Sequence, residues 1–308
     1  MRHKAHGPDV RLEPGPGRVD GHFRAGPRGA TARPGRHRAG PSRRSAACAD
    51  PRRPAHAARR LGGRSPGGLR RLRVVTLNTW KNDGDYPARL TRIADGLAAL
   101  DPDVVCLQEC FAGGGHDTAR VLSDALNLQL YAAPARAKVR ELKGAAVDST
   151  SGLAILTRLP GRAETLGLIS HPTDGERIAQ RFTTFRLRIL NLHLSHLRGG
   201  AGAVLRRRQL DEALDWARRD RSGSLLVCGD LNAGRGDPEL APLRAAAGDE
   251  LGSTLHAAGE GCAIDHAILL DPGDLDVSRR VRALATPDGD GRYPSDHAAV
   301  VVDLNSGS

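Results

Sequence analysis

Eight polar side chains in this sequence lie within or next to short apolar segments, most of them where a segment ends. They are carboxylate, amide and imidazole groups, namely Asn78, Glu109, His193, Asp230, Asn232, Asp265, Asp296 and His297. Carboxylate and amide oxygens are the ligands that Mg²⁺ and Mn²⁺ prefer. Histidines can transfer protons or bind a phosphate group near neutral pH. If the fold brings these groups to one rim, the chain has the parts of a metal-dependent site.

Each short segment also has an ordinary structural explanation. Gly229-Asp230-Leu231-Asn232 is typical of a turn, because Gly, Asp and Asn readily adopt turn conformations. Glu109 could face solvent after a strand, Ser295-Asp296 could be a cap, and Asp265-His266 could be a satisfied buried pair. The chemical interpretation therefore depends on the segments taken together.

The apolar pattern predicts the elements that must position these residues. Short apolar runs predict strands at 72–78, 103–109, 152–157, 181–187, 188–194, 224–229, 263–270 and 297–304. Helices are expected at 88–100, where apolar residues recur at helical spacing, and at 116–126, 203–219 and 238–246. Strands that follow one another without a helix, as in 181–194, argue against a purely alternating βαβ sheet. We therefore expect an α/β (α+β) fold of mixed β-sheets packed on each other, with helices on the outside.

The first 70 residues differ from the rest of the chain. Arg, Gly, Pro and Ala account for 48 of these 70 residues, and large aliphatic residues and Phe number only six. So little apolar surface cannot offset the entropy of ordering the segment. We expect residues 1–70 to form a disordered tail and residues 71–308 to form one domain. Because Met1 is the only methionine and these residue types have GC-rich codons, a mis-extended start is the alternative to a genuine basic arm.

The positive charge of the chain belongs to this tail. It holds 17 of the 46 Lys and Arg residues and 4 of the 35 Asp and Glu residues, which leaves residues 71–308 with 29 basic and 31 acidic residues, a net charge of −2. The isoelectric point near 10.3 therefore does not describe the domain. The arginines of 203–219 are interleaved with acidic residues, which favours a solvated, salt-bridged helix. A basic nucleic-acid-binding domain is disfavoured.

The sequence also bears on the compartment. No stretch approaches the ~18 apolar residues of a membrane span, and the tail lacks the apolar core of a secretory signal. Five cysteines form an odd number without a CxxC pair, and three of them lie in strongly apolar runs. Buried free thiols in a reducing compartment explain this best. We expect a cytoplasmic protein without integral membrane association.

Taken together and in order, the polar segments resemble the endonuclease/exonuclease/phosphatase superfamily, the deoxyribonuclease-I-like fold. The matching segments are Leu77-Asn78-Thr79-Trp80, Leu107-Gln108-Glu109, Ser151-Gly152-Leu153-Ala154-Ile155-Leu156-Thr157, Asn191-Leu192-His193-Leu194, Arg208-Gln209, Gly229-Asp230-Leu231-Asn232, Ile264-Asp265-His266 and Ser295-Asp296-His297. The resemblance covers 72–304 and omits the tail. It implies a four-layer sandwich of two mixed β-sheets with outer helices, and a metal-dependent phosphoesterase.

The resemblance assigns a metal site. Glu109 would be the principal ligand of Mg²⁺ or Mn²⁺, and Asn78 and Asp296 would help to hold the ion or its waters. The chemistry is consistent, because a phosphodiester is anionic and repels hydroxide unless a divalent ion neutralises it.

The resemblance also assigns the catalytic residues. Asp230 and Asn232 would position the attacking water and a phosphate oxygen. His297, oriented by Asp265, would act as a general base or as a hydrogen-bond donor to the phosphate; Asp230 is the other candidate base. His193 would bind the phosphate from the other side.

The pattern departs from one branch of the superfamily. Apurinic endonucleases place a tyrosine where this chain has His193, and their Trp-Asn-x-Asn-Gly opening is absent. The match is closer to members of the deoxyribonuclease, sphingomyelinase and inositol-phosphatase types. We expect His266 to be a packing residue and His196 to lie at the rim rather than bind a metal.

We expect a phosphodiesterase that acts on a small or lipid-derived phosphodiester. One alternative is a DNA or RNA nuclease that holds its substrate with the basic tail, since the domain itself offers little long-range attraction to a polyanion. Another is a non-catalytic binding module, which would be expected to have lost site residues; none is lost. Specificity is expected to lie in the loops 81–87, 111–117, 134–150 and 170–177.

Overall fold

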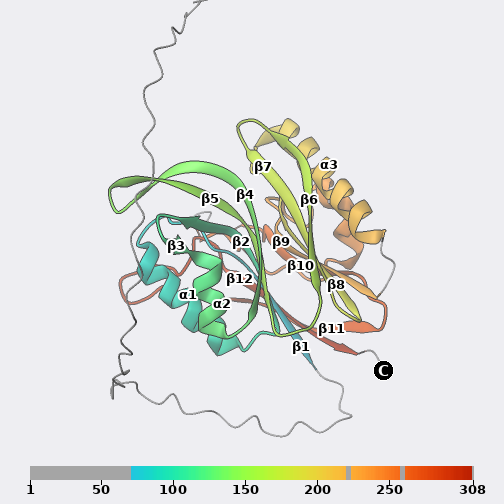
Figure 1. Cartoon of the computed structure of the whole chain (residues 1–308). Helices are drawn as coiled ribbons and strands as arrows, with labels where there is room; N and C mark the ends of the chain where they lie inside the picture. Colours follow the sequence, from blue (N-terminus) through green and yellow to red (C-terminus); the bar gives the residue numbers. More distant parts are fainter. Residues whose placement is uncertain (1–70, 220–222, 257–260, 307–308) are drawn as a thin grey trace, which may run out of the picture. The chain divides into compact units, whose positions relative to one another are not determined.

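Two mixed β-sheets form the centre of the computed structural model, which describes residues 71–219, 223–256 and 261–306 (Figure 1). These residues all belong to one structural unit, Arg64–Ser308. The tail predicted at residues 1–70 lies outside the described residues.

The first sheet contains β1 (Leu72–Asn78), β2 (Val104–Gly113), β3 (His116–Asp117), β4 (Gln129–Leu142), β5 (Ala145–Thr157), β11 (Leu275–Ala283) and β12 (Ala299–Ser306). Its strand order is β11-β12-β1-β2-β5-β4, and β3 pairs with β2. The second sheet contains β6 (Arg162–His171), β7 (Gly175–Thr183), β8 (Leu187–His193), β9 (Ser224–Asp230) and β10 (Asp265–Asp271). Its order is β10-β9-β8-β7-β6. Each sheet has one parallel pair, β1–β2 or β8–β9, among antiparallel neighbours, so both sheets are mixed as expected.

Helices cover the outer face of each sheet (Figure 1). They are α1 (Tyr86–Leu100) and α2 (Thr118–Leu126) on the first sheet, and α3 (Gly199–Arg218) with the 3₁₀ helix η1 (Pro238–Ala246) on the second. Strand alternation explains the layers, because successive side chains point to opposite faces of a sheet. Val75 and Leu77 pack in the layer that contains α1 and α2, whereas Val74 packs between the two sheets. The four-layer sandwich is thereby confirmed.

The topology brings the polar residues singled out in the sequence to one end of the strands. The parallel strands β8 and β9 end side by side, with His193 opposite Asp230. The antiparallel strand β10 begins at the same end, because Asp265 lies opposite Asp230. In the first sheet, β1 ends at Asn78 beside β2. The carboxyl ends of parallel strands are where ligands bind in open α/β sheets.

Several predicted boundaries are wrong for local reasons. The strand predicted at 181–187 is the end of β7 followed by a turn, which the hydrogen bond from Thr184 N to Leu187 O (2.9 Å) closes before β8. The helix predicted at 116–126 starts at Thr118, because the Asp117 side chain caps it by accepting from Arg120 N at 3.0 Å. The helix predicted at 238–246 is a 3₁₀ helix with Pro242, which has no N–H to donate, inside it.

The sequence analysis missed four strands. Three of them, β4, β6 and β11, lie at sheet edges, and the fourth is the two-residue β3, which pairs only with β2. The expected loop 134–150 is in fact a long hairpin of β4 and β5. An edge strand is paired on one side only and tolerates charged residues. Arg136, Lys138 and Arg140 interrupt β4, so it shows no continuous apolar run.

Helix α3 is only partly a solvated helix. Arg207 pairs with Asp211 one turn later at 2.8 Å on the exposed face, as predicted. Arg206, however, is buried and donates to Glu239 of η1 at 2.6 Å. The Arg206 side chain therefore links α3 to η1 and does not face solvent.

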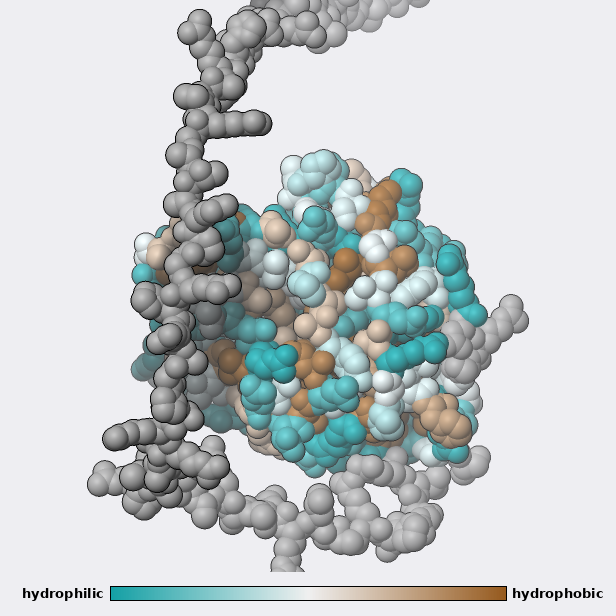
Figure 2. Space-filling view, in the orientation of Figure 1, coloured by the Kyte–Doolittle hydropathy of each residue, from teal (hydrophilic) through white to brown (hydrophobic). Residues whose placement is uncertain are grey.

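The surface mixes polar and apolar residues, and the three cysteines in apolar runs are buried, as the sequence predicted. On the face shown in Figure 2, apolar residues are scattered among polar ones. Among the helices that the structure describes, none is long and apolar enough to cross a membrane. Cys106, Cys110 and Cys228 are buried free thiols, and Cys262 is exposed.

Candidate active site

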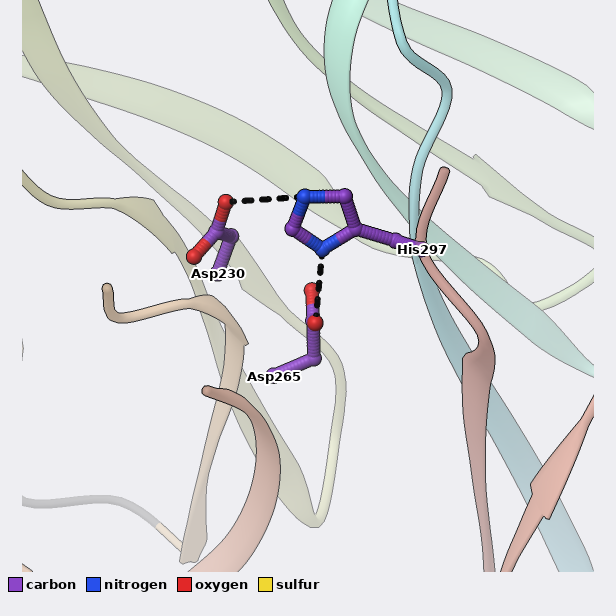
Figure 3. Close-up of side chains that lie close together, drawn as sticks. All are labelled: Asp230, Asp265 and His297. Atoms are coloured by element: carbon purple, nitrogen blue, oxygen red, sulfur yellow. Dashed lines mark hydrogen bonds and ion pairs between the residues drawn. The ribbon is translucent and has the colours of Figure 1, made fainter. Parts of the chain in front are cut away.

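The eight polar residues singled out in the sequence surround one cavity of about 340 Å³. Seven of them line it. The eighth, Asp265, is fully buried and hydrogen-bonded to His297 (Figure 3). The fold therefore brings the whole predicted set together, although its members are spread over more than 200 residues of sequence.

Asp230 is the centre of this set. Its Oδ2 accepts a hydrogen bond from Asn78 Nδ2 at 3.0 Å. The Nε2 atoms of His193 and His297 lie 3.5 Å and 3.8 Å from the same oxygen. Burial and then the nearby charge of Asp265 raise the pKa of Asp230 to about 7. This carboxylate can therefore exchange a proton near neutral pH.

The Gly-Asp-x-Asn segment is both a turn and part of the site. Gly229 has a φ of 133°, and a Cβ there would lie 1.9 Å from Leu192 O, so only glycine fits. Asp230 Oδ1 accepts from Asn232 N at 2.9 Å, and Asn232 has a φ of 51°. The turn directs both side chains into the cavity.

His297 and Asp265 form a buried dyad next to Asp230, and the two ring nitrogens of His297 face the two carboxylates (Figure 3). The His297 Nδ1 lies 2.8 Å from Asp265 Oδ2. Burial lowers the pKa of His297, but the charge and hydrogen bond of Asp265, together with Asp230 and Asp296, raise it to about 10. The ring is therefore positively charged at neutral pH.

His193 has the opposite protonation state. Burial lowers its pKa well below the usual value, and the positive charge of Arg177 lowers it further. Arg177 Nη1 also donates to His193 O at 3.4 Å. A neutral imidazole and a charged one thus face the same carboxylate.

Glu109 lies at a bulge in β2. Its φ is 55°, and the pairing of β2 with β5 shifts in register between Leu107 and Cys110. A bulge re-aims a side chain, and Glu109 here lines the cavity. Its Oε2 lies 2.7 Å from Lys81 Nζ.

Asn78, Glu109 and Asp296 provide oxygen donors that fit a divalent cation. Burial raises the pKa of Asp296, and the charge of Glu109 contributes in the same direction while those of His297 and Lys81 oppose it. Two carboxylates that repel each other at a cavity wall are stabilised by a bound cation. Asn78 adds a neutral amide oxygen, which also accepts from Trp80 N at 3.0 Å.

A second set, Asp230, Asp265 and His297, also has potential ligand atoms within 4.8 Å of one another. We interpret these three as a proton-transfer group instead. The His297 Nδ1 is already bound to Asp265, and a positively charged ring repels a cation.

The sequence analysis missed Arg89, which organises the loop beside the site. This arginine is 3% exposed, and its guanidinium donates to the carbonyls of Thr79, Trp80, Lys81, Asp83 and Pro294. The sequence does contain a signal for the burial of this arginine. Arg89 lies on the apolar face of α1, one turn before Ile93. A buried arginine at such a position needs acceptors from elsewhere in the fold.

Two further histidines lie where the sequence predicted. His266 is buried, and its Nε2 lies 2.8 Å from Ala233 O, as expected of a packing residue. His196 has a half-exposed side chain at the rim of the cavity. Its Nδ1 lies 2.5 Å from Asp174, which also binds Arg177.

The family model described as the endonuclease/exonuclease/phosphatase family matches residues 75–297. No curated protein sequence matches the chain.

Solved structures resemble the fold. An endonuclease/exonuclease/phosphatase from Beutenbergia cavernae has a TM-score of 0.63 and 22% identity, over 78% of this chain and 72% of its own. TDP2 from Caenorhabditis elegans has a TM-score of 0.57 and 18% identity, over 77% and 74%. The mannosyl-6-phosphatase Bt3783 from Bacteroides thetaiotaomicron has a TM-score of 0.55 and 20% identity, over 76% and 99%. At these identities the likeness is one of fold.

Proposed function

Because the chain belongs to the endonuclease/exonuclease/phosphatase family, we propose that it is a divalent-metal-dependent phosphoesterase that hydrolyses phosphodiester bonds by in-line attack of an activated water. The observation that carries the proposal is the Asp230 carboxylate, which has a pKa of about 7 and two histidines within 4 Å. A general base works best when its pKa is near the pH of the reaction.

Asn78, Glu109 and Asp296 are the residues that would hold Mg²⁺ or Mn²⁺. The ion, when bound, would neutralise the phosphate and stabilise the departing oxygen. Lys81 Nζ, which lies 2.7 Å from Glu109 Oε2, would have to move away from this carboxylate when the ion binds.

Asp230 is the proposed base, and Asn232 is its partner. Asp230 would accept the proton of the attacking water. Asn232 Nδ2 donates one hydrogen to Leu194 O at 3.1 Å, which leaves its second hydrogen for a phosphate oxygen. The bond from Asn232 N to Asp230 Oδ1 keeps the two side chains in a fixed relation.

The two histidines would bind the phosphate in different ways. His297 has its Nδ1 bound to Asp265 and carries a positive charge, so it acts as a hydrogen-bond donor through Nε2. Of the two roles expected for His297, the charged ring favours the donor over the base. His193 is neutral and binds the phosphate from the other side of Asp230.

We further propose that residues 71–308 are the catalytic domain and that the protein is cytoplasmic. The buried free thiols Cys106, Cys110 and Cys228 are consistent with a reducing compartment.

A neighbour in fold that is named a phosphatase supports the hydrolytic assignment. The domain's net charge of −2 favours a small or lipid-derived phosphodiester over duplex DNA.

The test is metal-dependent hydrolysis by the full chain. Bis-p-nitrophenyl phosphate, plasmid DNA, an abasic duplex, a choline phospholipid and an inositol phosphate are assayed in EDTA, Mg²⁺ and Mn²⁺. Asp230→Asn is expected to lower kcat by about 10²–10⁴-fold. The control is Asp271→Asn, a half-exposed carboxylate at the other end of β10 that pairs with Arg218. Absence of metal-dependent turnover on all five substrates would contradict the proposal.

A further inference from the structure

A second hollow lies between the loop after β1 and strand β4, next to the catalytic cavity. Its volume is about 410 Å³, and it shares Lys81 and Arg136 with the catalytic cavity. Asn82 Nδ2 donates to Glu141 O at 2.7 Å, which ties the loop to the strand. The hollow is therefore a defined groove that leads out of the proposed site.

The groove is rich in cations. Lys81, Arg136, Lys138 and Arg140 line it, against the carboxylates Asp83 and Glu141. Lys81 pairs with Glu109. Within the described part of the chain, no ion pair involves Arg136, Lys138 or Arg140. Three positive charges thus remain available to an anion.

Arg140 is held in place without being neutralised. Its guanidinium donates to Ser149 Oγ at 2.8 Å and to Ser151 Oγ at 3.0 Å. Ser151 also lines the catalytic cavity, so the guanidinium lies close to it. Burial and the charge of Arg136 lower the pKa of Arg140, which shows that the two cations are close enough to repel each other.

Gly175 leaves the space that the Arg136 side chain occupies. Gly175 of β7 has a φ of 74°, and a Cβ there would lie 2.7 Å from Arg136 Nε. The absent side chain lets the arginine pack across from the other sheet, where it lines both hollows. Guanidinium groups bind phosphate oxygens in a bidentate manner.

We propose that this groove is a second phosphate subsite, so that the preferred substrate carries at least one phosphate group beside the one that is hydrolysed. The inference rests on the proposed function, since it treats the adjoining cavity as the place of hydrolysis. It narrows the substrate class to esters with two or more phosphates. Such esters are either short nucleic-acid strands or phosphorylated small molecules.

The test compares two substrates with the same scissile bond. They are the p-nitrophenyl ester of thymidine 5′-phosphate and the same ester with a 3′-phosphate. The double variant Lys138→Gln/Arg140→Gln changes two cations that line the groove but not the catalytic cavity. It is expected to raise KM about tenfold for the bisphosphate only, with kcat unchanged. The control is Lys143→Gln, an exposed cation at the tip of the same hairpin that does not line the groove. Full-length chains are used throughout, so the basic tail contributes equally to each.

Equal changes for both substrates, or no change for either, would overturn the subsite. A binding measurement separates this result from failure of the proposed function. Thymidine 3′,5′-bisphosphate is titrated calorimetrically in EDTA, where turnover plays no part. Weaker binding by the double variant but not by Lys143→Gln supports the subsite even if no ester is hydrolysed, and equal binding by all three proteins overturns it.

Competition identifies the source of the second phosphate. A thymidylate tetramer and inositol hexakisphosphate are each tested as inhibitors of bisphosphate hydrolysis. The inhibitor whose potency falls in the double variant shows which class occupies the groove. If neither inhibits the wild-type chain, the subsite is overturned.

Discussion

The imidazole of His297 and the carboxylate of Asp265 are joined through a third segment as well as by their own 2.8 Å contact. Thr254 is the link. Its Oγ1 accepts from Asp265 N at 3.1 Å, and its carbonyl accepts from Ala298 N at 2.7 Å. The dyad is therefore aligned by backbone contacts before any substrate binds, as preorganised catalysis requires.

Because Asp265 is hydrogen-bonded to His297 and helps to keep its ring charged, loss of the two residues should not be additive. Asp265→Asn and His297→Ala are each expected to lower kcat, by about 10²–10³-fold for the histidine. The double variant should be as slow as His297→Ala alone. The kcat values of the wild type, the two single variants and the double variant are measured by steady-state kinetics on a chromogenic diester. Additive losses of activation free energy would mean that the two residues work independently.

Arg89 is expected to stabilise both the fold and the loop that carries Trp80 and Lys81. Arg89→Met leaves five buried or partly buried carbonyls without their donor, and should lower the free energy of unfolding by about 3 kcal/mol or more. Arg92→Met, one turn along α1, removes a more exposed ion pair and should cost less than about 1 kcal/mol. Urea denaturation measures both, and similar losses would refute the special role of Arg89.

The cross-strand pair of Arg73 and Asp303 predicts a pH-dependent difference in stability. Arg73 Nε lies 2.7 Å from Asp303 Oδ1, and this hydrogen bond lowers the pKa of Asp303 below its usual 3.8. A carboxyl with a depressed pKa stabilises the fold above its unfolded-state pKa, and this contribution is lost as the pH falls through the folded-state value.

Asp303→Asn should therefore lower the free energy of unfolding at pH 7, by about 2 kcal/mol. The gap between variant and wild type should narrow as the pH falls below 3.8 and then through the lower folded-state pKa of Asp303. Thermal melts from pH 7 downwards measure the gap. A gap that stays constant across this range would show that the charge of Asp303 is not what stabilises the pair.

Removal of residues 1–70 should leave folding and basal hydrolysis intact. Within the described part of the chain, the three apolar layers consist of residues between Leu72 and Leu304. The 71–308 chain should therefore melt at the temperature of the full chain in differential scanning calorimetry. Precipitation, or loss of most of the transition, would mean that the tail packs on the domain.

The sequence predicted the central strands and the polar residues that gather at one cavity, because both leave a local signal. The apolar runs before Asn78 and Asp230 predict buried strands, and the polar residues themselves show where these strands end. The order of such segments then supplied the family resemblance, although each segment alone was ambiguous.

The remaining features depend on contacts between distant segments. Edge strand β4 carries charges on a partly exposed surface, and Lys81 becomes the partner of Glu109 only when the loop after β1 folds back. The opposite charge states of His193 and His297 arise from burial and neighbouring charges that no sequence pattern displays.

Glu109 provides the most direct test of the central claim, that this cavity holds a divalent ion for phosphoester hydrolysis. Mn²⁺ binding by calorimetry and Mg²⁺-dependent hydrolysis of bis-p-nitrophenyl phosphate are measured on the full chain, on Glu109→Gln and on Glu176→Gln. Glu176 lines the same cavity and has no proposed role. We predict that Glu109→Gln keeps its melting temperature but loses ion binding and hydrolysis, while Glu176→Gln retains both. Unchanged ion affinity in Glu109→Gln would contradict the account.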